Sequence, residues 1–92
     1  MRTSNPPSYD KIFSIYAGSG TLSIDTNLSS HRGLLLINTS GSTITNAVTV
    51  KNRETATTVT LAIAPGAIVL PLQVQSIGIG TQNTSIYIYG LV

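Results

Sequence analysis

The sequence predicts an all-β fold: a small β-sandwich or jelly-roll-like domain of about six to eight antiparallel strands. Short runs rich in Ile, Val, Leu and Thr recur about every 8–12 residues, separated by Gly, Asn and Ser. Most of these runs alternate apolar and polar residues, as strands with one buried face do. No window carries apolar residues at the three- and four-residue spacing of a helix.

The first half of the chain contains three predicted strands. Residues 11–18 form the first, with Tyr16 and Ile12 expected on one face. A glycine turn then leads into a second strand over residues 20–25. The unbroken apolar run within residues 33–38 predicts a third strand that is covered on both faces.

Three further strands are predicted in the second half. Residues 43–52 and 58–64 alternate valine, leucine and isoleucine with threonine, which suits a half-buried sheet. The last strand, residues 85–91, sets two isoleucines opposite Tyr87 and Tyr89.

Residues 64–80 form another predicted strand, with Pro71 in its middle. Because proline cannot donate to a ladder, we expect an edge strand. The apolar alternation changes phase near Ser76, which predicts a β-bulge there.

The length of 92 residues suits one domain. We expect residues 1–10 to be an extended arm, because Pro6 and Pro7 favour a polyproline-like path, and residues 11–92 to be the β-sandwich. A domain of this size buries a modest core, and no cysteine is present to staple it. Help from a neighbouring subunit is therefore expected.

Charged residues make up only 9% of the chain, whereas apolar residues make up 41%. So little charge favours association over a dispersed monomer. The net charge of +2 comes from scattered basic residues, with Lys51 and Arg53 as the one close pair. A nucleic-acid surface needs a larger cluster with aromatic partners, so we expect no nucleic-acid partner. No segment is long and apolar enough to predict a signal peptide or a membrane span.

The residues also give little support to catalysis. Three carboxylates, Asp10, Asp25 and Glu54, are far apart in sequence, and His31 is expected to be an exposed loop histidine. The glycine-rich segments lack the Lys-Ser/Thr pair and the following helix of a phosphate-binding loop. We expect no enzyme activity, no cofactor and no metal site.

Aromatic residues and prolines are the candidate partner-binding residues. They are Pro6, Pro7, Tyr9, Tyr16, Pro71, Tyr87 and Tyr89. Tyr16, Tyr87 and Tyr89 are also the basis of an alternative hypothesis, in which a shared aromatic face binds carbohydrate.

The opening segment "YAGSGTLSID" and the C-terminal third of the chain resemble a family of small bacteriophage virion proteins. The residues that carry the resemblance in the C-terminal third are Ala64, Pro65, Gly66, Leu70, Pro71, Leu72, Val74, Ile77, Gly80, Thr81, Thr84, Ile86 and Leu91. The family also tends to have basic residues after the Leu-Pro pair, where Gln73 and Gln75 stand here.

The resemblance implies a structural protein of the virion, made in the host cytoplasm. The first expectation is a capsid decoration or cement protein that binds the major capsid protein or other virion proteins as a homo-oligomer, a trimer or a pentamer. The alternative within this class is the base of a head spike or a tail-attached base protein.

Overall fold

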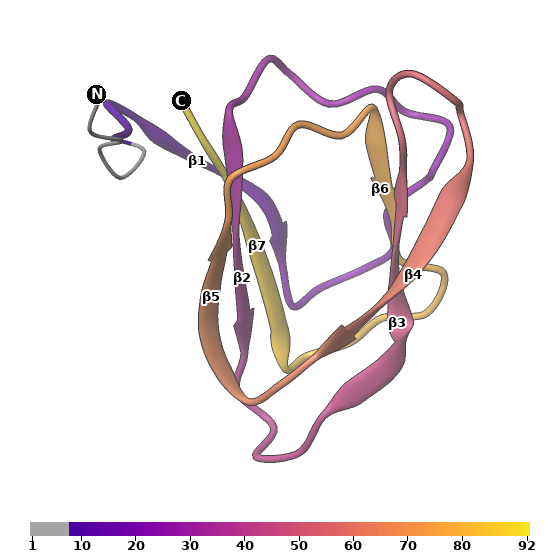
Figure 1. Cartoon of the computed structure of the whole chain (residues 1–92). Helices are drawn as coiled ribbons and strands as arrows, with labels where there is room; N and C mark the ends of the chain where they lie inside the picture. Colours follow the sequence, from indigo (N-terminus) through magenta and orange to yellow (C-terminus); the bar gives the residue numbers. More distant parts are fainter. Residues whose placement is uncertain (1–7) are drawn as a thin grey trace, which may run out of the picture.

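Two antiparallel sheets face one another in the computed structural model, which describes residues 8–92 (Figure 1). The first sheet has the order β1-β7-β2-β5 and the second the order β4-β3-β6. The strands are β1 (Ile12–Ala17), β2 (Gly33–Asn38), β3 (Ile44–Lys51), β4 (Thr58–Ile63), β5 (Gly66–Leu70), β6 (Ser76–Gly78) and β7 (Ile86–Leu91). This arrangement confirms the predicted all-β sandwich. Within residues 8–92 no helix is long and apolar enough to cross a membrane.

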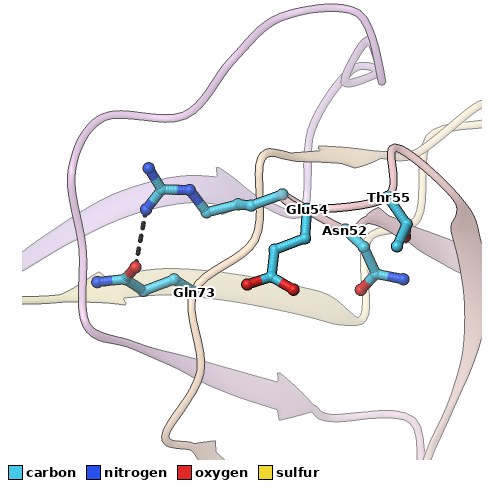
Figure 2. Close-up of a pocket in the computed structure, with 5 residues that line it drawn as sticks. Asn52, Glu54, Thr55 and Gln73 are labelled. Atoms are coloured by element: carbon cyan, nitrogen blue, oxygen red, sulfur yellow. Dashed lines mark hydrogen bonds between the residues drawn. The ribbon is translucent and has the colours of Figure 1, made fainter.

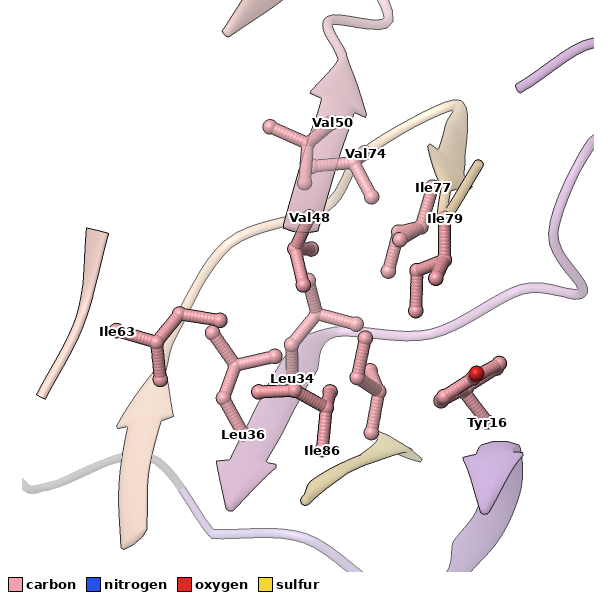
Figure 3. Close-up of a cluster of buried hydrophobic side chains, with 11 residues drawn as sticks. Tyr16, Leu34, Leu36, Val48, Val50, Ile63, Val74, Ile77, Ile79 and Ile86 are labelled. Atoms are coloured by element: carbon pink, nitrogen blue, oxygen red, sulfur yellow. The ribbon is translucent and has the colours of Figure 1, made fainter. Parts of the chain in front are cut away.

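The core lies between the two sheets (Figure 3). Its members are the inward-facing residues that alternation predicts, including Val48 and Val50 of β3 and both isoleucines of β7. Gly90 also faces inward, beneath the ring of Phe13. Aliphatic side chains from both sheets therefore make up most of this small core.

Residues 20–25 do not form the predicted strand. The chain leaves the first sheet at Gly18 and crosses to the second, where Leu22 makes a single bridge with Ile79. Beyond that bridge, Ile24 packs over Gly78 of β6, and its C=O accepts a hydrogen bond from the Ser76 hydroxyl. Ile24 thus covers β6, whereas Leu22 lies beside Ile79 and packs against the core.

The prediction for Pro71 is partly wrong. β5 is an edge strand, as expected, but it ends at Leu70, and Pro71 follows it. The Leu72 N–H donates to the Leu70 C=O over 2.8 Å, which makes Pro71 the centre of a three-residue turn. The chain then crosses to the other sheet and enters β6 at Ser76. The phase change reflects this crossing, and the predicted bulge at Ser76 is absent.

A β-bulge occurs instead in β1, where the pairing with β7 shifts between Ser14 and Tyr16. The shift turns Tyr16 toward the core, opposite Ile88, whereas Ile12 stays outside, opposite Leu91. The two residues therefore do not share the face that regular alternation predicts.

The predicted arm reaches the sandwich before residue 11. The Asp10 N–H donates to the Val92 C=O, and Arg32 Nη2 donates to the Ser8 C=O over 2.6 Å. Residues 8–10 are thus attached to the end of the first sheet. Pro6 and Pro7 lie outside the described residues.

Candidate association surface on strand β5

Strand β5 is an edge strand that exposes apolar side chains on both of its faces. Ile68 shares the inner face with Leu36, and Val69 shares the outer face with Leu35. Nevertheless Ile68 is 51% exposed and Val69 is 47% exposed. Every side chain from residue 61 to residue 72 is apolar, apart from the glycine. Edge strands in soluble proteins are usually blunted by charge, by proline or by a cover, so an edge of this kind is a candidate site for association.

The direction of the free backbone groups on this edge follows from the ladders. β7 lies between β1 and β2, and residues of a central strand bond alternately to their two neighbours. Val92 and Lys11 exchange both of their backbone hydrogen bonds, and the Thr39 N–H donates to the Ser85 C=O. Even-numbered residues of β7 therefore bond to β1, and odd-numbered residues bond to β2.

The same alternation continues across β2 to the edge. Its odd-numbered residues bond to β7, so its even-numbered residues, such as Leu36, bond to β5. Leu36 lies opposite Ile68, which assigns the even-numbered residues of β5 to the β2 ladder. The N–H and C=O groups of Ala67 and Val69 consequently point to the free edge. In the described part of the chain they have no hydrogen-bond partner.

The chain passes from β4 to β5 beside this edge (Figure 1). An apolar groove lies at this crossing. Its volume is about 360 Å³. Its lining includes Leu36, Leu61, Ile63, Pro65, Ile68 and Leu70. The groove opens because β4 and β5 belong to different sheets and only Ala64 and Pro65 connect them.

At Gly33, Tyr9 covers the outer face of the first sheet, with the Arg32 guanidinium over the Tyr9 ring. The strand residues of this outer face are uncharged, and the face is continuous with the β5 edge. By register its members are Ile12, Ser14, Ala17, Gly33, Leu35, Ile37, Ala67, Val69, Tyr87, Tyr89 and Leu91. The expected coverage of β2 on both faces is therefore only half realised: Leu34 and Leu36 are fully buried inside, whereas Leu35 and Ile37 are half-buried outside.

The predicted aromatic face includes Tyr87 and Tyr89 but not Tyr16. Tyr87 and Tyr89 lie on the outer face and are half-buried. Tyr16 is only 4% exposed, and its hydroxyl donates to the Gly20 C=O and accepts the Asn83 N–H. Its buried position rules out the three-tyrosine carbohydrate platform.

Tyr9 and Pro71, the two remaining described candidates, are in different surroundings. The Tyr9 ring lies against Gly33 with the Arg32 guanidinium 5.4 Å from its centroid, so it packs on its own sheet. Pro71 is exposed beside Leu72, next to the β5 edge. Of these two residues, only Pro71 therefore borders the association surface, which consists of the β5 edge and the groove beside it.

A polar hollow lies at the β3–β4 turn (Figure 2). Arg53 Nη1 donates to Gln73 Oε1 over 2.7 Å, and Glu54 lies between Gln73 and Asn52. The hollow contains one carboxylate and no histidine, so it assembles neither a carboxylate pair nor a nucleophile with a base. Across residues 8–92 no three His, Cys, Asp or Glu side chains gather in a way that could hold a metal ion.

His31 differs from the exposed loop residue that the sequence predicts. It is 3% exposed, and its Nε2 accepts the Val74 N–H. It therefore holds the segment between β5 and β6 in place beside the association surface. A lone histidine in a polar stretch carries no signal of this role, since the contact joins residues 43 positions apart.

Comparisons of the chain with protein-family models, with curated proteins and with solved structures find no match.

Proposed function

We propose that this chain is a non-enzymatic structural protein of a bacteriophage virion, and that it acts as a decoration or cement protein on the capsid. The observation that carries the proposal is the exposed apolar edge of β5, where the Ile68 and Val69 side chains are each about half exposed. A neighbouring protein that covers these side chains best explains why they are apolar. The resemblance to small virion proteins supplies the setting in which that neighbour is a capsid or another virion subunit.

The chemistry of the surface supports association with proteins. Covering the exposed parts of Ile68, Val69 and Leu72 would contribute about 1 kcal/mol for each side chain. Together these side chains contribute about 3 kcal/mol, which is less than the roughly 4–15 kcal/mol that association costs, so one such contact alone would be weak. On a symmetric particle, however, many linked copies would act together, and the total binding would be strong.

The experiment that tests the proposal is mass spectrometry on purified particles of the virus that encodes the chain. We expect the chain at a fixed ratio to the major capsid protein, and cryo-electron microscopy should then place it on the particle. A position on the capsid surface supports the decoration role, whereas a position at a spike or tail supports the alternative base role. Absence from particles, when the chain is present in the infected cell, contradicts both.

The carbohydrate hypothesis keeps one supporting observation, the adjacent outward-facing rings of Tyr87 and Tyr89. A glycan array probed with the wild-type chain tests it. Binding that is lost in a variant with both tyrosines changed to serine would favour this second function. Binding that persists in that variant, or no binding at all, would exclude it.

A further inference from the structure

We propose that a second copy of this chain pairs with the free edge of β5, strand against strand, across a two-fold axis beside Ile68. The inference rests on the proposed function, because it names the first neighbour that the associating protein would bind. It joins the two four-stranded sheets into one sheet of eight strands. A two-fold contact produces a dimer, so this proposal replaces the trimer or pentamer expected from the sequence.

The free backbone groups of this edge are suited to binding another β-strand. Ala67 and Val69 direct their backbone donors and acceptors outward, and backbone groups of this kind bind a neighbouring strand. Between Gly66 and Leu70 no charge, proline or bulge blocks the approach. Pro71 follows immediately and limits the pairing to these five residues.

The strand that fits this edge best is β5 of another copy. An antiparallel pair of identical strands is two-fold symmetric, so the pairing is complementary to itself. With the axis beside Ile68, Ala67 lies opposite Val69 of the second copy, and the reverse holds on the other side of the axis. The two copies then exchange four backbone hydrogen bonds. The two Ile68 side chains meet on the inner face.

Side-chain chemistry points to the same partner. Both faces of β5 are apolar, so an incoming strand must be apolar on both faces as well. Among the other edges in the described chain, β4 carries Thr58 and Thr60 on its outer face, and β1 begins beside Asp10 and Lys11. The third, β6, has three residues, begins with Ser76 and is flanked by the Leu22–Ile79 bridge. β5 is the edge strand that meets the requirement without a polar or charged side chain.

The size of the contact indicates a weak dimer. The edge of β5 is about 17 Å long and about 10 Å thick, which is well below the roughly 500 Å² per copy of a specific interface. The groove supplies more surface, because Ile68 of the second copy would lie at its mouth, close to Leu61 and Ile63. We therefore expect a dimer whose population depends on concentration.

Sedimentation velocity of the full chain over a range of concentrations tests the inference. The wild-type chain should shift from monomer to dimer as its concentration rises. I68K and I68E should each raise the dimer Kd at least tenfold, because like charges would meet at the axis. An equimolar mixture of the two variants should restore a dimer. V59K is the matched control: Val59 is an equally exposed valine on the β4 edge, and its replacement should leave the dimer unchanged.

A second pair of variants separates backbone pairing from side-chain contact. V69P removes the Val69 N–H from the free edge, whereas V69A shortens the side chain and keeps the N–H. Loss of two of the four hydrogen bonds should weaken the V69P dimer about 30-fold more than the V69A dimer. Circular dichroism of each variant confirms that the sandwich is still folded. Equal dimer strength in folded V69P and V69A contradicts strand pairing.

The outcomes keep this inference apart from the proposed function. A wild-type chain that stays monomeric up to about 1 mM overturns the inference, even when the chain is found in purified particles. Oligomers that persist unchanged in I68K overturn it as well, because another surface then makes the contact. A β5-dependent dimer of a chain that is absent from particles supports the inference and overturns the proposed function.

Discussion

His31 accepts the backbone N–H of Val74 through Nε2 over 3.1 Å, and its Nδ1 lies 2.9 Å from the Ser29 C=O. Because Nε2 is the acceptor, Nδ1 carries the proton and donates to Ser29. One buried ring therefore joins the segment before β2 to the segment that crosses from β5 to β6. This contact fixes the path by which the chain changes sheets.

We expect H31A to lower the free energy of unfolding by about 2–4 kcal/mol, because it leaves the buried Val74 N–H unpaired and opens a cavity. H31Q should lose less, since an amide oxygen can accept the same N–H. Urea denaturation measures the difference. S30A, at an exposed neighbouring position, should change stability by less than about 0.5 kcal/mol. An H31A variant as stable as S30A would show that the crossing does not depend on the ring.

Asn38 is a second buried polar residue with every group in use. Its Nδ2 donates to the C=O groups of Ser42 and Ile63, and its Oδ1 accepts the Ser40 N–H. We expect N38A to cost about 2–3 kcal/mol of stability, and N38D to be worse, because a carboxylate would face two carbonyl oxygens. Thermal and urea unfolding measure both variants, with N46A at an exposed position as the control. Equal stability of N38D and N38A would contradict the assigned donors.

The two tyrosine hydroxyls at positions 9 and 16 should respond oppositely to removal. The Tyr16 hydroxyl makes two hydrogen bonds, so Y16F should cost about 1–2 kcal/mol. The Tyr9 hydroxyl is buried without a partner in the described structure, so Y9F should leave stability unchanged or raise it by up to about 1 kcal/mol. Chemical denaturation of the two variants in one buffer tests the contrast. A Y9F variant less stable than Y16F would contradict it.

Alternation along the chain predicts which residues of a strand share a face, and it does so correctly wherever the strand is regular. In β7, Ile86 and Ile88 face the core and Tyr87 and Tyr89 face outward, as expected. The prediction fails at Tyr16, because a bulge is a property of the pairing and not of one strand.

The sheet to which a strand belongs is also hidden from local pattern. Residues 64–80 alternate almost without interruption, yet they form the end strand of one sheet, a crossing and the end strand of the other. Leu22 and Ile24 alternate as a strand would, but Leu22 makes only a single bridge with Ile79 and Ile24 packs over Gly78 of β6. Three-dimensional partners decide these cases, and those partners are far away in sequence.

The candidate association surface is the part of the protein that sequence reasoning identifies least well. Low charge predicts association, and Pro71 predicts an edge, but neither indicates which side chains are exposed. Ile68 and Val69 have the composition of a buried strand. They are exposed because β5 is last in its sheet and an apolar groove, lined in part by Leu61 and Pro65, lies beside its inner face. Their exposure therefore depends on the position of β5 in the folded protein and cannot be predicted from local sequence.

Ala56 adopts a backbone conformation that favours glycine. Its φ is +56°, in the turn where the Ala56 N–H donates to the Asn52 C=O and the Asn52 N–H donates to the Thr57 C=O. The left-handed conformation costs a residue with a Cβ about 1–2 kcal/mol, and glycine avoids this cost. Glycine in turn loses about 0.5–1 kcal/mol of chain entropy on folding. We therefore expect A56G to raise the free energy of unfolding by up to about 1 kcal/mol.

The matched control for A56G is A62G, because Ala62 is an exposed alanine within the regular strand β4. In this regular strand a glycine relieves no backbone strain, and it still loses more chain entropy on folding than alanine does. A62G should therefore lower the free energy of unfolding by about 0.5–1 kcal/mol. Urea unfolding of both variants, analysed with a common m-value, gives the two shifts with opposite signs. If A56G, like A62G, is less stable than the wild type, the β3–β4 turn does not hold Ala56 in the left-handed region in solution.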